Sequence, residues 1–135
     1  IMALLGGSAL IMLLALPVER QVAFYASPDL RSWRRVGQFG PAGGTGGIWE
    51  CPDLFSLPVD GDRSRWKWVL KVDLNPGHPA GGSGGQYFVG EFDGSSFVRD
   101  ASAEPQQWVD HGRDFYCATH WHFRPDALPD MTWIG

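Results

Sequence analysis

Glu50 is the carboxylate in this chain whose surroundings best suit acid–base chemistry. It stands between an aromatic ring, Trp49, and a thiol, Cys51, inside the largely apolar segment 47–55. A glutamate that is partly removed from water keeps its proton to a higher pH than a solvated one, as a general acid must. A surface glutamate at a strand end is the alternative interpretation, because structural carboxylates outnumber catalytic ones.

The residues around Glu50 carry a resemblance to a known family. The segment Trp49–Phe55, with the sequence WECPDLF, resembles the signature around the acid/base glutamate of glycoside hydrolase family 32, which includes invertases, inulinases and levanases. The likeness runs from about residue 11 to the C-terminus. Other segments resemble further blocks of this family, in the same order along the chain. They are Val22–Leu30, Lys67–Pro76, Gly81–Gly90 and Asp114–Tyr116.

The resemblance implies an all-β fold, since the catalytic domain of this family is a five-bladed β-propeller. That domain is more than twice as long as the 135 residues of this chain. We therefore expect residues 1–135 to form one partial N-terminal catalytic propeller domain, truncated at both ends.

The resemblance also implies the roles of the catalytic groups. A retaining glycosidase uses two carboxyl groups about 5–5.5 Å apart, one as nucleophile and one as acid/base. Glu50 corresponds to the acid/base. The family's nucleophilic aspartate lies in an Asn-Asp-Pro block and its transition-state-binding aspartate in an Arg-Asp-Pro block, and both are expected before residue 1. Arg113-Asp114 lacks the proline and Arg124-Pro125-Asp126 has the wrong order. The chain alone is therefore expected to be inactive.

Several side chains near these blocks are candidates for binding the sugar. Trp121 corresponds to a family tryptophan at the pocket rim, where an indole stacks on the sugar, although a core tryptophan is the alternative. Trp49 either shapes the surroundings of the acid or packs between blades. Asp53 and Asp114, and less so Asp73, either hydrogen-bond sugar hydroxyls or cap turns.

The cysteines and histidines give no metal site or cofactor site. Cys51 and Cys117 lie too far apart for a local metal knuckle and are too few for a disulfide framework. Cys117 stands where the resemblance leads us to expect a small residue. Two reduced, partly buried thiols on inner strands of neighbouring blades are favoured over a disulfide. His120 and His122 lack a third ligand, so exposed, unpaired histidines are expected.

A weak internal repeat supports a propeller independently of the resemblance. Segments 24–33 and 87–97 share an aromatic strand, a turn built on aspartate and a further aromatic residue. Trp33 and Phe97 are about 64 positions apart, and Trp68 and Trp133 nearly the same. This period suits four-stranded blades with long loops.

Short apolar or alternating runs predict the strands that position these residues. Between them lie turn signals such as Asn75-Pro76-Gly77 and Asp93-Gly94. We expect two blades and the beginning of a third, without helices. For the apolar stretch 1–17, a buried strand at about 9–16 is favoured over a signal peptide or membrane span. The predicted strands are 10–16, 21–26, 33–37, 54–57, 66–74, 86–92 and 97–99.

Composition agrees with an all-β protein that handles sugars. The chain has 18 Gly, 10 Pro and 7 Trp but only 19% charged residues, which favours short strands and tight turns. Its formal charge of −4 argues against a nucleic-acid partner. The glycine runs 43–47 and 81–85 lack the Lys-Ser/Thr ending of a phosphate loop.

We therefore predict a piece of a secreted, retaining hydrolase that releases fructose from fructans or sucrose, with Glu50 as general acid/base. Neither a nucleic acid nor a membrane is expected as a partner. A non-catalytic carbohydrate-binding or structural propeller segment is the first alternative. A neighbouring furanosidase family with the same propeller is the second, although the Glu50-Cys51 pair counts against it.

Overall fold

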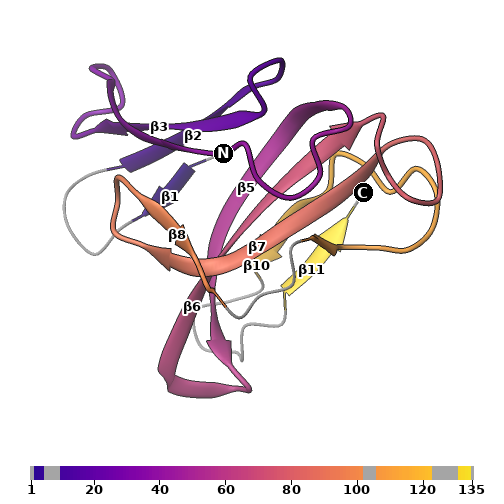
Figure 1. Ribbon diagram of the computed structural model, residues 1–135. Helices are drawn as coiled ribbons and strands as arrows, with labels where there is room; N and C mark the ends of the chain where they lie inside the picture. Colours follow the sequence, from indigo (N-terminus) through magenta and orange to yellow (C-terminus); the bar gives the residue numbers. More distant parts are fainter. Residues whose placement is uncertain (1, 5–9, 102–105, 123–130, 135) are drawn as a thin grey trace.

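The described residues of the protein form three antiparallel β-sheets (Figure 1). The computed structural model describes residues 2–4, 10–101, 106–122 and 131–134, and the side chains of residues 10–101 and 106–120. No helix is present in these described parts of the chain. The first sheet contains β1 (Met2–Leu4), β2 (Leu10–Leu16), β3 (Gln21–Ser27) and β4 (Arg34–Phe39). The second contains β5 (Ile48–Val59), β6 (Asp62–Asn75), β7 (Gly84–Phe92), β8 (Phe97–Arg99) and β9 (Gln107–Trp108), and the third contains β10 (Thr119–His122) and β11 (Met131–Ile134).

The sheets have the order expected of propeller blades. In the first two sheets each strand pairs with the next one along the chain, and the short β9 adds to β7. The third sheet is a two-stranded ribbon of β10 and β11, which pair from Thr119 with Ile134 to His122 with Met131. The prediction of an all-β chain with two blades and the beginning of a third is thus confirmed.

The apolar stretch near the N-terminus forms a strand. Strand β2 covers Leu10–Leu16, as predicted, and its buried residues Ile11 and Leu13 face the core. In the described part of the chain, no helix has the length and apolar character needed to cross a membrane.

The internal repeat corresponds to a repeated turn. Asp29 accepts hydrogen bonds from the backbone N–H groups of Arg31 and Ser32, at 2.9 and 2.8 Å. Asp93, 64 positions later, accepts them from Ser95 and Ser96, at 2.8 and 2.7 Å. The first turn joins β3 to β4 and the second joins β7 to β8. The period found in the sequence is therefore the period of the blades.

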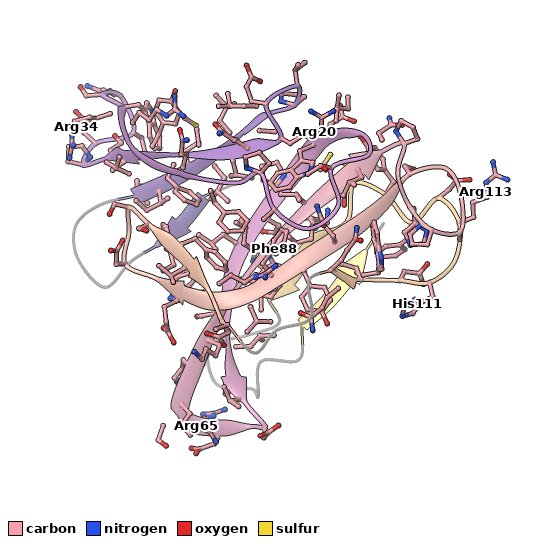
Figure 2. All side chains as sticks on the ribbon, in the orientation of Figure 1. Arg20, Arg34, Arg65, Phe88, His111 and Arg113 are labelled. Atoms are coloured by element: carbon pink, nitrogen blue, oxygen red, sulfur yellow. The ribbon has the colours of Figure 1, made fainter. Side chains whose placement is uncertain are left out.

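Aromatic rings fill the space between the first two sheets (Figure 2). Phe39 contacts Phe88 and Phe97 edge to face, with ring centroids 4.9 and 5.1 Å apart, and stacks on Trp49. The ring centroids of Phe24 and Phe92 are 5.0 Å apart. Because large rings bury the most apolar area per residue, these contacts hold the first sheet against the second.

Strand β5 is longer than predicted. It begins at Ile48, not near residue 54, and contains a bulge between Glu50 and Asp53. Glu50 pairs with Asp73, and Asp53 pairs with Lys71, so three steps along β5 match two along β6. Cys51 lies in the bulge with a φ of 45°. The extra residue interrupts the alternation of apolar and polar side chains, which is why the sequence pattern missed this half of the strand.

Candidate active site

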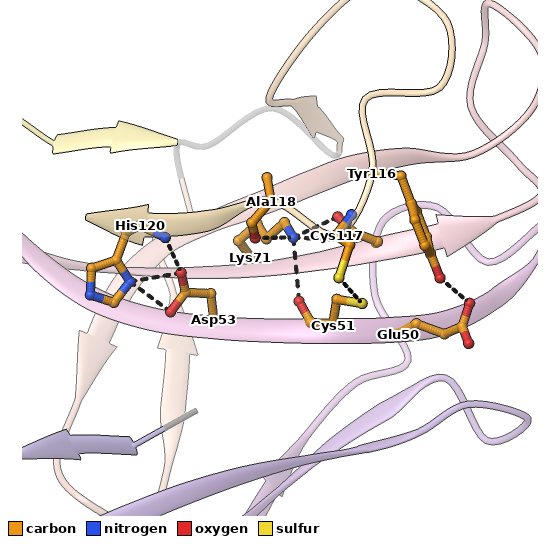
Figure 3. A network of polar contacts seen from close by, with 9 residues as sticks. Glu50, Cys51, Asp53, Lys71, Tyr116, Cys117, Ala118 and His120 are labelled. Carbon is orange, nitrogen blue, oxygen red and sulfur yellow. Dashed lines mark hydrogen bonds and ion pairs between the residues drawn. The ribbon is translucent and has the colours of Figure 1, made fainter. Parts of the chain in front are cut away.

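A row of three side-chain contacts joins β5 to the segment that leads into β10 (Figure 3). Glu50 meets Tyr116, Cys51 meets Cys117, and Asp53 meets His120, at sequence separations of 66, 66 and 67. The near-constant separation means that the two segments run in the same direction beside each other. We call this set the polar row.

Glu50 is half-buried and receives a hydrogen bond from the Tyr116 hydroxyl, which donates to its Oε2. Burial raises the pKa of Tyr116 well above its ordinary value, and the Glu50 carboxylate raises it further. The hydroxyl therefore keeps its proton at neutral pH and remains a donor to the carboxylate. From the sequence, Glu50 was a candidate catalytic residue, whereas Tyr116 was only part of the motif Asp114–Tyr116.

A buried ion pair lies beneath the polar row. The side chains of Lys71 and Asp73 are both fully buried, and Nζ lies 2.7 Å from Oδ1 and 2.8 Å from Oδ2. Oδ1 has no hydrogen bond of good geometry although it lies against the ammonium. Burial raises the pKa of Asp73, and the Lys71 charge opposes that shift. Gly85 leaves room for the carboxylate, since a Cβ there would lie 2.9 Å from Oδ1.

The same ion pair fixes the backbone of the polar row. Lys71 Nζ also donates to the carbonyl oxygens of Ala118, at 2.7 Å, and Cys51, at 3.3 Å. Asp73 Oδ2 accepts from the Cys117 backbone N–H at 2.8 Å. Sequence analysis missed Lys71. The available signal was a lysine two positions before an aspartate in an otherwise apolar strand, which places both on one face.

Asp53 and His120 form a second buried contact. Asp53 is fully buried and accepts from the His120 backbone N–H at 2.9 Å, while His120 Nδ1 lies 2.7 Å from its Oδ2. The expectation of an exposed, unpaired histidine at 120 is wrong, because its ring is largely covered and held by Asp53. The carboxylate of Asp53 is therefore held by His120 and shielded from solvent in this chain.

Of the other candidates, Trp49 lies in the core and Asp114 at the surface. Trp49 has no exposed area, packs against Phe39 and donates its indole N–H to the Gly44 carbonyl at 2.9 Å. Of the two roles expected for it, packing agrees with its ring contacts to Phe39 and Phe88. Asp114 has 62% of its side chain exposed.

Trp121 and His122 belong to β10 by their backbone, with Trp121 paired to Thr132, but their side chains lie outside the described residues. The structure thus leaves the expected sugar contact of Trp121 untested. Arg124, Pro125 and Asp126 also lie outside the described residues.

The two cysteines are free thiols in contact. Cys51 is half-buried, Cys117 is exposed, and their sulfur atoms are 3.2 Å apart. Burial raises the pKa of Cys51 to about 12, and the neighbouring Cys117 adds to the shift. Within the residues that the structure describes, no three histidine, cysteine or acidic side chains gather as a metal site would require.

Chemically, the polar row offers one half-buried carboxyl group with a permanent hydrogen-bond donor beside it. The buried ion pair and the Asp53–His120 contact hold the strands on which this carboxyl group stands. A group that is positioned in this way can give and take a proton at a substrate atom. The other buried carboxylates, Asp53 and Asp73, are engaged by cationic or N–H partners.

The sequence and the fold of the chain were compared with known proteins, and both match one family. The family model of the glycosyl hydrolases family 32 N-terminal domain matches residues 6–135. The chain is 44% identical to the levanase of Bacillus subtilis over 116 residues, covering 85% of this chain and 17% of that protein. It is 50% identical to the extracellular exo-inulinase of Aspergillus niger over 105 residues, covering 73% of this chain and 19% of that protein.

The fold agrees with a solved structure. The exo-inulinase from Aspergillus awamori superposes with a TM-score of 0.80 at 39% identity, covering 91% of this chain and 25% of that one. The chain therefore spans less than a fifth of the two curated relatives and a quarter of the solved structure.

Proposed function

Because the chain belongs to glycosyl hydrolase family 32, we propose that it is part of a longer enzyme, a retaining glycosidase that releases fructose from fructans or sucrose. The names of the two relatives, a levanase and an exo-inulinase, support fructans as the substrate class. Residues 1–135 then supply two blades and the beginning of a third to a five-bladed catalytic propeller, with further chain on both sides. The whole protein is proposed to be secreted, in line with the extracellular exo-inulinase.

Glu50 acts as the general acid/base in this proposal. The observation that carries it is the position of Glu50 in the polar row, half-buried and hydrogen-bonded by Tyr116. In the first step, Glu50 protonates the glycosidic oxygen while a carboxylate attacks the anomeric carbon. In the second step, it removes a proton from the water that hydrolyses the fructosyl-enzyme.

The attacking carboxylate comes from a part of the protein outside this chain. Asp53 and Asp73 are fully buried and held by His120 and Lys71, so neither is available as a nucleophile. The sequence contains no Asn-Asp-Pro or Arg-Asp-Pro block. We therefore expect residues 1–135 alone to be inactive.

Sugar contacts are proposed for Trp121, as a stacking surface at the pocket rim, and for the exposed Asp114, as a hydrogen-bond acceptor. Trp49 and Asp53, which are both fully buried, act through their neighbours instead. Trp49, the neighbour of Glu50 on β5, anchors that strand in the apolar core, and Asp53 holds His120.

The test is fructose release by the full-length protein from sucrose, inulin and levan. Glu50→Gln should lower kcat by about 10²–10⁴-fold, the usual contribution of general acid–base catalysis. Glu19→Gln, at an exposed glutamate outside the polar row, is the matched control and should leave kcat unchanged.

An aryl fructoside sharpens this test, because a good leaving group departs without protonation. Glu50→Gln should then form the fructosyl-enzyme at a rate closer to that of the wild type. Equal release of fructose from sucrose by Glu50→Gln and the wild type would disprove the assignment of Glu50. A full-length protein that binds fructans without cleaving them would favour the non-catalytic alternative.

A further inference from the structure

Two thiols from distant parts of the sequence meet in the middle of the polar row. Cys51 and Cys117 are 66 positions apart, and their sulfur atoms lie 3.2 Å from each other (Figure 3). One belongs to the bulge in β5 and the other to the segment that precedes β10. A covalent bond would require the sulfurs to approach by about 1 Å, given an S–S length of about 2.05 Å.

We propose that Cys51 and Cys117 form a disulfide bond in the folded protein by exchange with a low-molecular-weight disulfide such as oxidised glutathione. The bond would join the second sheet to the segment that leads into the third, next to Glu50 and Tyr116. This inference rests on the contact between the two thiols and does not require that Glu50 be catalytic.

The backbone on both sides of the contact is held in place. The Cys51 carbonyl accepts from Lys71 Nζ, and the Cys117 backbone N–H donates to Asp73 Oδ2. Both groups of the ion pair are fully buried, so the two cysteines are anchored on one rigid support. Holding two reacting groups together in this way raises their effective concentration and favours the internal bond over a mixed disulfide.

The two thiols differ in access, which sets the order of the reaction. Cys117 is exposed, whereas Cys51 is half-buried and its pKa is raised to about 12. The thiolate is the nucleophile in exchange, so the exposed Cys117 reacts first with the external disulfide. It loses its proton, forms a mixed disulfide and releases one reduced glutathione.

The second step closes the bridge. Cys51 loses its proton and attacks the Cys117 sulfur, and a second reduced glutathione leaves. In total, two protein thiols are oxidised to one disulfide while one oxidised glutathione is reduced to two thiols. No other oxidant is required.

The experiment uses the full-length protein, reduced, freed of reductant and then incubated with oxidised glutathione at neutral pH. Free thiols are blocked with iodoacetamide in denaturant, and the protein is digested and analysed by tandem mass spectrometry. We expect a peptide pair joined through Cys51 and Cys117, lighter by two hydrogens than the two reduced peptides. The pair should separate on reduction.

Two variants test the order of the steps. Cys51→Ser should stop at a stable Cys117–glutathione mixed disulfide, and Cys117→Ser should leave Cys51 largely unmodified. If either variant fails to fold, the mass-spectrometric result for the wild type alone tests the proposal. Accumulation of the mixed disulfide in the wild type, or recovery of both cysteines in alkylated form, would overturn it. The Glu50→Gln variant should form the bridge as the wild type does, so failure of this inference and failure of the proposed function can be told apart.

Discussion

The second sheet is packed on both faces, and the two faces use different chemistry. Along β6, Leu70, Val72 and Leu74 point into the apolar core shared with the first sheet, whereas Lys71 and Asp73 point the other way. Along β5, Trp49 and Leu54 share the apolar face. Glu50 and Asp53 share the polar face with the ion pair, because Glu50 is the cross-strand partner of Asp73 and Asp53 that of Lys71.

The bulge in β5 makes this division complete. In a regular strand, Glu50 and Asp53 would point to opposite faces, because they are three positions apart. The extra residue in the bulge lets both carboxylates pair across the strands with the Lys71–Asp73 ion pair. On the apolar face, Trp49 still pairs with Leu74, and Leu54 still pairs with Leu70. One irregularity thus serves the apolar core and the polar row together.

The two faces should respond differently to substitution. Apolar contacts are non-directional, so a core of rings tolerates exchange of one apolar side chain for another of similar volume. A buried charge needs its specific partner, because an unpaired ion in the interior is costly. Predictions for the two faces therefore differ in size and in kind.

The largest effect is expected from Lys71→Ala on the polar face. The substitution leaves the buried Asp73 carboxylate without its cation and two backbone carbonyls without the Nζ donor. Breaking a buried pair from one side costs about 3–5 kcal/mol, which urea denaturation of the full-length protein would measure. Lys67→Ala is the matched control on the same strand, where a half-exposed ammonium pairs with Glu91 and Asp100. Its effect should be far smaller, because exposed ion pairs contribute little.

The paired replacement of Lys71→Met with Asp73→Val separates stability from positioning. Removing both charges should restore most of the stability lost in Lys71→Ala. The carbonyl of Cys51 and the N–H of Cys117 would still lack their partners, so fructose release should stay below that of the wild type. A paired variant as unstable as Lys71→Ala would show that the ion pair itself stabilises the fold.

On the apolar face, Phe88→Leu should cost about 2 kcal/mol through lost ring contacts and imperfect filling. Phe88 is 2% exposed and lies against Phe39 and Trp49. The midpoint of thermal unfolding should fall while kcat at 25 °C stays unchanged. A loss of kcat in the folded variant would mean that the two faces are not independent.

The apolar face was largely predictable from the sequence. The strand predicted at residues 10–16 was found as β2, whose seven residues are all apolar, and the one at 97–99 was found as β8, after the turn at Asp93-Gly94. The repeat around Asp29 and Asp93 predicted the blade period, because each aspartate side chain stabilises its turn by accepting hydrogen bonds from backbone N–H groups two and three residues later.

The polar face was predictable only in part. Glu50 was identified because a family motif surrounds it, but its partner Tyr116 is 66 positions away. The pairing of Asp53 with His120, and the burial of Lys71, depend on how the third sheet lies against the second. The sequence pattern places Lys71 and Asp73 on one face of a strand, but it does not reveal their partners, because a charged residue in a strand is ordinarily expected to face solvent.

A smaller effect is expected from Tyr116→Phe, which removes one hydroxyl from the polar row. The variant keeps the ring but loses the hydrogen bond to the Glu50 carboxylate. A bond to a charged group contributes about 1.5–3 kcal/mol, of which we expect about 1.4 kcal/mol to reach the transition state, a tenfold loss of kcat/KM. Tyr25→Phe, on β3 of the first sheet, is the control, and an unchanged kcat/KM for Tyr116→Phe would argue against the contact.

The smallest effect is expected outside both faces, at the repeated turns. Backbone hydrogen bonds lower the pKa of Asp29 and of Asp93 below the ordinary value of 3.8. Each aspartate therefore stabilises the fold above pH 3.8, and this contribution is lost as the pH falls through the lowered pKa. Asp29→Asn with Asp93→Asn keeps an acceptor oxygen in each turn but removes the titration. In urea denaturation from pH 5 to pH 2.5, the slope of stability against pH should be shallower for the double variant than for the wild type. Identical slopes would mean that these turns play no part in the acid sensitivity.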